Sequence, residues 1–220
     1  MTVYRNEGGL FDDTNLSQIA TYPEWTLPEI EEIRRSLEEL VEKKDALFEE
    51  HDNNLDRKKT AYYWTSHILR RLQFCHSVVE RAPGDEDMRP EFTLFFGSED
   101  FSAARNYRGT RNFFSEALSV MRTVAWDDSL DGDGGVNPAY ELDRYMRQTG
   151  VSWGILTNGH VWRLYHRDTS GLLTTYYEVD MLAALESSEL DDFKYFYLIF
   201  SRTGLGGATR GQSIVDRLYD

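Results

Sequence analysis

The stretch VSWGILTNGHVWRLYHRD, residues 151–168, constrains the fold of this chain more than any other segment. It contains two runs rich in β-branched and aromatic residues, with the pair Asn158-Gly159 between them. Both residues of such a pair accept positive φ angles, which favours a tight hairpin turn. We therefore expect two antiparallel neighbouring strands, at about 153–157 and 161–166.

The flanking segments predict more strands and a helix around this hairpin. Strand-like composition occurs in EFTLFF (91–96), in residues 118–126 and in LLTTYYEVDM (172–181). Asn137 followed by Pro138 indicates the start of a helix that runs to about residue 149. This order of elements predicts an α/β (α+β) fold with a mixed central sheet flanked by helices.

Helical spacing of apolar residues predicts further helices at 26–50, 56–80, 189–205 and 211–220. Thr26 and Glu29 match a capping box at the start of the first helix. Its apolar stripe is narrow, which fits either a coiled-coil seam or, as we favour, packing on its own domain. Helix 189–205 is the aromatic helix, and its rings are spread too widely for one helix face: Phe193, Tyr195, Phe196, Tyr197 and Phe200. We interpret these rings as core rather than as a base-stacking platform. The Gly-rich stretch 204–211 lacks the Lys of a phosphate loop and is interpreted as a flexible connection.

Three sections are expected along the chain, with neither an internal repeat nor a second globular domain. Residues 1–53 form an N-terminal segment with an amphipathic helix, residues 54–203 form the α/β domain, and residues 204–220 form a tail with a short helix.

Composition limits the class of protein. No apolar run approaches the ~18 residues of a membrane span, no signal peptide is evident, and the single cysteine, Cys75, fits a reducing cytoplasm. The formal charge is −14, with 38 acidic residues and only five Lys among 24 basic residues. This acidic composition suggests a salt-adapted, halophilic protein, in which net charge alone does not argue against DNA binding. The five His residues are not spaced like zinc ligands. The sequence also lacks the Gly-x-Ser-x-Gly motif that carries a catalytic serine, and it lacks the Gly-rich loop with which a methyltransferase binds its methyl donor.

Four stretches occur in an informative order: RPEFTLFF, ALSVMRTVAWDDSLD, NPAYELDRYMRQTGVSWGILTNGHVWRLYHRD and YYEVDMLAAL. Together they resemble the N-terminal nuclease-like domain of type IIG restriction–modification enzymes, a PD-(D/E)xK domain with a restriction-endonuclease-like fold. Related patterns occur in type I restriction subunits. The resemblance spans roughly residues 54–203. It implies a place in DNA restriction or phage defence, with Mg²⁺-dependent DNA cleavage as the family's chemistry.

The resemblance also implies where a nuclease site would lie. Glu91 stands where the family has Asp, Arg122 where it has a metal-binding Glu, Val124 where it has Lys, and Glu141 where a helix carries Gln. Two carboxylates normally hold Mg²⁺, while the Lys stabilises charge in the transition state. An Arg cannot bind Mg²⁺, and Val offers nothing to a phosphate. The catalytic motif is therefore degenerate, and the sequence favours a nuclease-fold module that has lost cleavage and needs no cofactor.

Three hypotheses remain open at this stage. The favoured one is an inactive module that binds DNA or a partner such as a methyltransferase or another restriction subunit. Arg105, Arg108 and Arg111 form its candidate phosphate-contacting loop. The second is an active Mg²⁺-dependent endonuclease with relocated carboxylates, drawn from Glu91, Glu116, Asp127 and Asp128. The third is a structural module that forms a homodimer through helix 26–50 or the aromatic helix.

Overall fold

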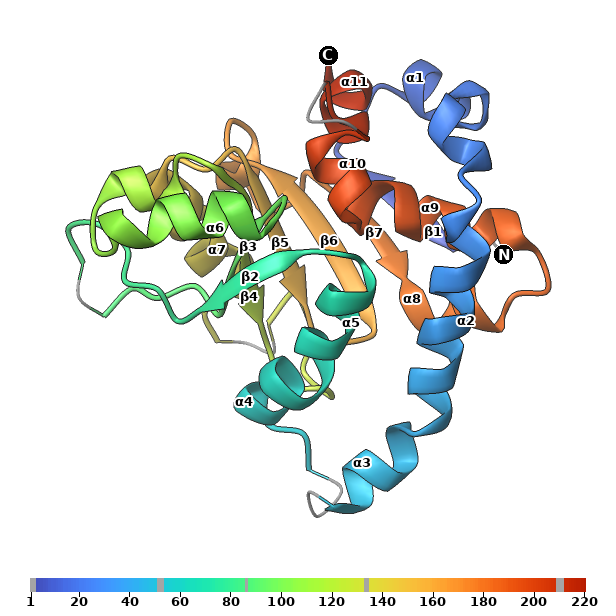
Figure 1. Cartoon of the computed structure of the whole chain (residues 1–220), viewed down its shortest axis with the longest axis horizontal. Helices are drawn as coiled ribbons and strands as arrows, with labels where there is room; N and C mark the ends of the chain where they lie inside the picture. The colour runs from blue at the N-terminus through green and yellow to red at the C-terminus, as the bar shows by residue number, and fades with distance from the viewer. Residues whose placement is uncertain (1–2, 51–53, 86, 133–134, 209–211) are drawn as a thin grey trace.

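A single mixed sheet forms the centre of the molecule (Figure 1). The computed structural model describes residues 3–50, 54–85, 87–132, 135–208 and 212–220. Over these residues the sheet has seven strands in the order β1-β7-β6-β5-β4-β3-β2, and only β4 and β5 run parallel. The strands are β1 (Tyr4–Glu7), β2 (Cys75–Val78), β3 (Phe92–Phe95), β4 (Ala117–Thr123), β5 (Trp153–Thr157), β6 (Val161–His166) and β7 (Tyr176–Asp180).

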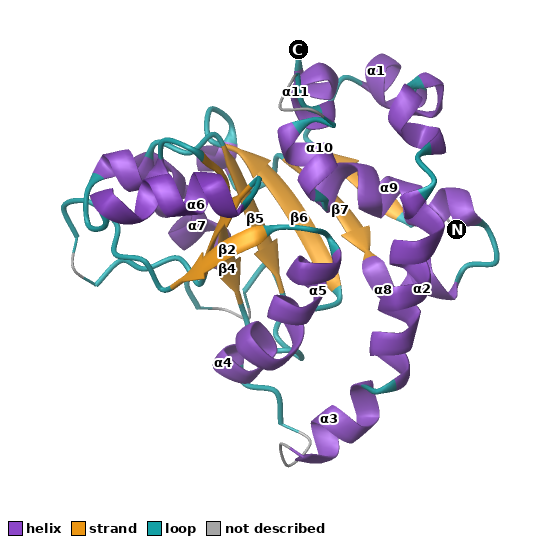
Figure 2. Ribbon diagram, viewed as in Figure 1, coloured by secondary structure: helices purple, strands orange, loops and turns teal. Residues whose placement is uncertain are grey.

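Helices flank this sheet, so the expected α+β fold class is confirmed (Figure 2). The helices are α1 (Asp13–Ser17), α2 (Glu29–Glu42), α3 (Lys44–Glu50), α4 (Arg57–Lys59), α5 (Ser66–Arg71), α6 (Ser98–Ala104), α7 (Pro138–Thr149), α8 (Met181–Glu186), α9 (Leu190–Phe200), α10 (Arg202–Gly206) and α11 (Ile214–Tyr219). A π-helical segment, Thr60–Thr65, joins α4 to α5. Short 3₁₀ turns lie at Ile19–Thr21, Pro23–Thr26, Arg105–Tyr107, Arg111–Phe114 and Ser170–Leu172. Within the described residues, no helix is long and apolar enough to cross a membrane.

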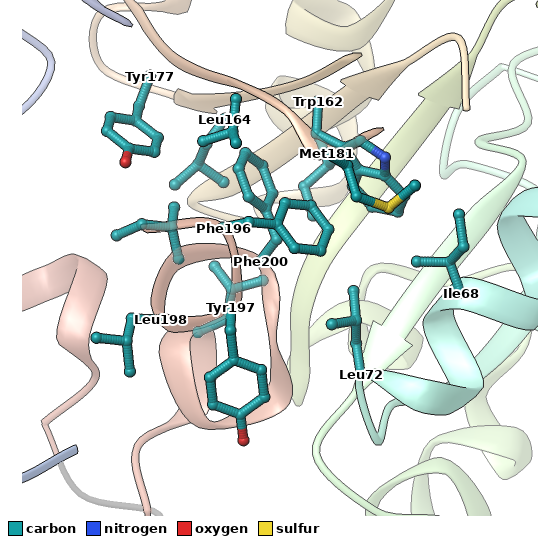
Figure 3. Packing of buried hydrophobic residues seen from close by; sticks show 14 of the residues in the cluster. Ile68, Leu72, Trp162, Leu164, Tyr177, Met181, Phe196, Tyr197, Leu198 and Phe200 are labelled. Carbon is teal, nitrogen blue, oxygen red and sulfur yellow. The ribbon is translucent and has the colours of Figure 1, made fainter. Parts of the chain in front are cut away.

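Two hydrophobic clusters pack on the two faces of the sheet. The first lies under α2, α5 and α9, and Figure 3 shows Trp162 beside the rings of Phe196 and Phe200. The centroids of those two rings lie 5.6 and 5.8 Å from that of Trp162. The second cluster lies under α6 and α7 and contains Val120 and Leu156 of the central strands. The aromatic side of α9 is therefore core, as the sequence indicated.

The β5–β6 hairpin is confirmed, but its turn is wider than the tight two-residue turn expected. Thr157 is the last residue of β5 that pairs with β6, and its partner is Trp162. Four residues, 158–161, therefore lie between these two paired residues. Gly159 has φ +100°, whereas Asn158 is not among the residues with positive φ. Instead, Asn158 Oδ1 accepts a hydrogen bond from the Val161 N–H at 2.9 Å. The asparagine therefore stabilises the turn through its side chain and not through its backbone conformation.

Helix α7 begins and ends where the sequence predicted. Asn137 Oδ1 accepts from the Ala139 N–H at 2.8 Å, Pro138 is the first helical residue, and Gly150 ends the helix with φ +82°. The helix packs closely on the sheet because Gly154 of β5 faces it: a Cβ atom there would lie 2.6 Å from Met146 Sδ. All four strand segments expected at 91–96, 118–126, 153–157 and 161–166 lie in the one sheet with α7 on it.

The predicted helix 56–80 is wrong beyond Arg71. Gln73 has φ +69°, which ends the helix, and Cys75–Val78 instead forms β2, an edge strand paired with β3. Tertiary pairing here overrides the helical spacing of Leu72, Cys75 and Val79. Strand β1, at the opposite edge of the sheet, has no counterpart among the predicted elements.

The first helix also differs in detail. The capping box is not formed, because Thr26 Oγ1 donates to the Pro23 carbonyl at 3.1 Å and Pro28 precedes α2. The helix is interrupted at Lys43, which lies between the end of α2 at Glu42 and the start of α3 at Lys44. Its apolar side is buried on the domain at Ile30 and Leu37, in agreement with the favoured interpretation.

The Gly-rich stretch is not a flexible connection over its first part. Gly204 and Gly206 are buried in α10, and a Cβ atom at Gly204 would lie 2.3 Å from the Leu198 carbonyl oxygen. The remainder of that stretch, 209–211, lies outside the described residues, as do 51–53 in the predicted break after the first helix.

Candidate functional site

Glu91 is buried immediately before β3 and accepts hydrogen bonds through both of its oxygens. Its side chain is 6% exposed. Oε1 accepts from Arg122 Nη1 at 3.0 Å and also from Nη2 of Arg57, while Oε2 accepts from the Thr123 N–H at 3.1 Å. A carboxylate that has lost its hydration needs such partners, because an unpaired buried charge is very costly. Both oxygens of Glu91 are therefore engaged within the protein.

Arg122 lies between this carboxylate and that of Glu141. Strand parity directs Arg122 to the α7 face together with Val120 and Val124. Its Nε lies 2.6 Å from Glu141 Oε2, a short ionic contact whose angle does not meet that of a hydrogen bond. The guanidinium is 10% exposed, and its Nη1 also donates to the Thr123 carbonyl at 3.1 Å. Arg122 is thus an internal cation between two carboxylates.

Val124 makes no polar side-chain contribution to this site. It is 5% exposed and belongs to the second hydrophobic cluster, while its backbone N–H donates to the Thr157 carbonyl at 2.9 Å. The structure therefore brings Glu91, Arg122 and Glu141 into direct contact, and Val124 lies just past the end of β4, two residues from Arg122.

A pocket of about 610 Å³ opens beside these residues. Three segments line it: α4 with the π-helical segment, the loop between β2 and β3, and α7. Its lining consists of Arg57, Lys58, Ala61, Tyr62, Val79, Asp85, Asp87, Met88, Arg89, Glu91, Glu141, Arg144 and Tyr145. Four cations and four carboxylates therefore face one cavity, together with aromatic and apolar side chains.

Burial shapes the ionisation of this pocket. It lowers the pKa of Arg57, with a further contribution from the neighbouring Arg122. It also raises the pKa of Tyr62 and of Tyr145, so both hydroxyls stay protonated at neutral pH. The pocket thus presents neutral hydroxyls beside charged guanidinium groups.

The donor set at this site does not fit Mg²⁺. Hard divalent cations take oxygen ligands, and Glu91 has no oxygen free of a hydrogen bond. The guanidinium of Arg122 stands between the two carboxylates and carries a positive charge that would repel the ion. Within the described part of the chain, no group of three or more His, Cys, Asp or Glu is arranged to hold a metal ion.

The residues of the relocated-carboxylate hypothesis are not brought together. Glu116 precedes β4, whereas Asp127 and Asp128 follow its far end. The seven residues of that strand span roughly 23 Å at about 3.3 Å per residue, so Glu116 is remote from the two aspartates. Asp128 Oδ2 instead accepts from the Ala125 N–H at 3.3 Å, within the turn.

The three candidate phosphate-contacting arginines are exposed but do not line the pocket. Arg105 and Arg108 lie over the Phe101 ring at 5.9 Å each, and Arg108 pairs with Glu80 at 2.9 Å. Arg111 lies against Gly150 and lines a separate cavity of about 510 Å³. These arginines are therefore distributed over a surface and do not converge on one point.

Sequence reasoning missed the cations that do reach the pocket. Arg57 and Lys58 belong to the segment RKK, the one run of three basic residues in the chain, which was a usable signal in so acidic a sequence. Arg144 had no such signal. A second buried network was also missed: Arg163 donates to Glu178 at 2.5 Å and to Asp131 at 2.6 Å.

Comparisons with known proteins add no identification: no family model, no curated protein and no solved structure matches this chain.

Proposed function

We propose that this protein is a nuclease-fold module of a DNA restriction–modification or phage-defence system, that it does not cleave DNA, and that it binds DNA or a partner subunit in the cytoplasm. The observation that carries the proposal is the guanidinium of Arg122 between Glu91 and Glu141. These are the positions at which the resemblance expects the metal-binding site.

The chemical reason is that a guanidinium cannot replace Mg²⁺ in phosphodiester hydrolysis. A divalent ion polarises the phosphate and lowers the pKa of a bound water, and both effects require open coordination positions. Arg122 neutralises the carboxylates but supplies neither, because it stays protonated and has only N–H donors. The two ion pairs of Arg122 also offset the repulsion between Glu91 and Glu141. This supports the view that the site stabilises the fold although it does not cleave DNA.

A binding role is supported by the cations beside this site. Arg57 and Arg144 are 46% and 49% exposed, and Lys58 is exposed as well. In a chain of formal charge −14, this concentration of cations in one pocket offers a place for a phosphate group. A methyltransferase or another restriction subunit is the partner class that the resemblance implies.

The test of lost cleavage uses the protein and one rebuilt variant. We expect the unmodified protein to leave duplex DNA uncut in Mg²⁺ or Mn²⁺. The variant combines Glu91→Asp, Arg122→Glu, Val124→Lys and Glu141→Gln, which restores the family's set of side chains. Weak metal-dependent nicking by that variant supports the proposal. Circular dichroism checks that Lys at the buried position 124 has not unfolded it.

Cleavage by the unmodified protein would overturn the proposal. If that cleavage also disappears on changing Glu116, Asp127 or Asp128 to Ala, the endonuclease with relocated carboxylates takes its place. DNA binding is tested separately by fluorescence anisotropy of a labelled duplex over a series of KCl concentrations. Binding that weakens with salt supports phosphate contacts. Absence of binding, with a dimer in analytical ultracentrifugation, favours the structural-module hypothesis.

A further inference from the structure

The pocket beside Glu91 has more hydrogen-bond donors to spare than acceptors. Asp85 already accepts three of the roughly four hydrogen bonds that a carboxylate can take: Oδ1 accepts from the N–H groups of Asp87 and Met88 at 3.0 and 3.2 Å, and Oδ2 accepts from Arg144 Nη2 at 3.1 Å. Both oxygens of Glu91 are likewise engaged. Two of the four carboxylates in the lining therefore have little acceptor capacity left for a ligand.

Two arginines of the lining, Arg57 and Arg144, keep most of their donors. A guanidinium has five N–H donors. Within the described part of the chain, Arg57 uses one group, Nη2, toward Glu91, and Arg144 uses Nη2 toward Asp85. Each carboxylate holds its arginine in place while leaving the other N–H groups for a ligand. Lys58 adds an exposed ammonium.

The two other carboxylates do not cancel this surplus. Glu141 lies 2.6 Å from Arg122 Nε, and that ion pair offsets its charge. Asp87 is exposed to solvent, where its field is screened. An acceptor-rich anion is therefore the ligand that complements the pocket, and a phosphate monoester offers the most acceptors in the smallest volume.

The remainder of the lining suits a flat ring attached to that phosphate. Ala61, Tyr62, Met88 and Tyr145 supply aromatic and apolar surface, and the hydroxyls of the two tyrosines are protonated donors at neutral pH. The Tyr62 ring is itself held edge-on to Phe92, with centroids 6.1 Å apart. A volume of about 610 Å³ is within the range of small-molecule sites, about 300–1,000 Å³.

We propose that this pocket binds a nucleoside 5′-monophosphate group, with the phosphate on Arg57 and Arg144 and the base against the tyrosines. The group comes either from a free nucleotide or from the 5′-phosphorylated end of a DNA strand. The inference rests on the proposed function in that it uses the same site, but it names a terminal phosphate and not the internal phosphates of a duplex.

Calorimetric titration of the full chain with dAMP, deoxyadenosine and inorganic phosphate tests the inference. We expect dAMP to bind at least about tenfold more tightly than either fragment, because only dAMP fills both halves of the pocket. Arg144→Gln is expected to weaken dAMP binding about tenfold by removing a charge-assisted donor. Arg147→Gln is the matched control: Arg147 lies on the same helix, is 53% exposed and pairs with Asp143, but does not line the pocket. It should leave the affinity unchanged.

No dAMP binding at millimolar concentration, or an equal loss in both variants, overturns the inference. The source of the phosphate is decided by comparing an oligonucleotide with and without its 5′-phosphate. A preference of about tenfold for the phosphorylated strand assigns the site to DNA ends, whereas equal affinities assign it to the free nucleotide. A duplex with 5′-hydroxyl ends separates the two proposals: if it binds while dAMP does not, the proposed function stands and this inference fails.

Discussion

At the scale of single residues, one row of side chains across the sheet explains why so many charges are buried. The strand register places Glu91 beside Arg122, and the row continues across the next four strands with Leu156, Arg163, Glu178 and Arg5. Each arginine in this row has a carboxylate neighbour, and the apolar Leu156 separates Arg122 from Arg163. Like charges directly opposite each other would destabilise a sheet, and this order avoids that.

Replacing Arg122 by Met should therefore destabilise the fold by about 2–4 kcal/mol, since it leaves Glu141 without its cation and Glu91 with one guanidinium instead of two. Urea denaturation at neutral pH measures the change. Arg144→Met is the matched control, because Arg144 and Asp85 form an exposed pair that contributes less than about 1 kcal/mol. Equal effects of the two substitutions would contradict the internal-cation role of Arg122.

His76 gives the molecule a specific sensitivity to acid. Burial, assisted by the nearby Arg70, lowers its pKa to about 4, and its Nδ1 has no hydrogen-bond partner in the described structure. The unfolded chain binds this proton below a pKa of about 6.5, whereas the folded chain does not until about 4. Stability should therefore fall as pH decreases through this window, by about 1–2 kcal/mol between pH 7 and pH 5. Urea denaturation of the protein and of His76→Gln at pH 7 and pH 5 measures this contribution. If His76→Gln loses as much stability between the two pH values as the unmodified protein does, the role of His76 is refuted.

At the scale of elements, the sequence predicted what local signals determine. The β5–β6 hairpin and α7 were found because Asn158-Gly159 and Asn137-Pro138 act within a few residues of the structures they specify. Strand β2 was missed because its conformation depends on pairing with β3, about 17 residues further along the chain. The positive φ of Gln73, which separates α5 from β2, leaves no residue-type signature.

The candidate site follows the same division. Glu91, Arg122 and Glu141 were named from the resemblance, and the structure brings them into contact. The basic run RKK could have drawn attention to Arg57, but its contact with Glu91 joins residues 34 positions apart, and no sequence pattern encodes that pairing. The pocket itself arises only when α4, α7 and the β2–β3 loop meet, which requires the tertiary structure.

The spacing between α7 and the sheet should depend on Gly154. A methyl group at this position would lie 2.6 Å from Met146 Sδ and 3.0 Å from a Leu142 methyl, closer than atoms pack without strain. Gly154→Ala should therefore cost about 1–3 kcal/mol and shift α7 together with Glu141. Gly135→Ala is the control, because no atom of the described residues lies within 4 Å of a Cβ atom there. Thermal unfolding of both variants measures the difference, and an unchanged midpoint for Gly154→Ala would show that α7 adjusts freely.

At the scale of the whole molecule, the charge of −14 must be separated from the local charges of the site. Arg122 and Arg163 pair with the buried carboxylates Glu91 and Glu178, and these buried pairs are screened little by salt. Electrostatic repulsion acts instead among the exposed acidic side chains. Glu39 and Glu42 are an example, because they lie at the end of α2, where the helix dipole also disfavours negative charge.

Salt should therefore stabilise this protein, because it screens the repulsion among exposed carboxylates more than it weakens the buried pairs. We expect the melting temperature to rise between dilute buffer and molar KCl, and an increase of roughly 5–10 °C would correspond to about 2–3 kcal/mol in a chain of this size. Differential scanning calorimetry over a KCl series measures it. Glu39→Lys combined with Glu42→Lys changes the formal charge by four, from −14 to −10, and should melt higher in dilute buffer and respond less to KCl. A flat or falling response of the parent protein would remove the salt-adaptation hypothesis, and the acidic surface would then count directly against DNA binding.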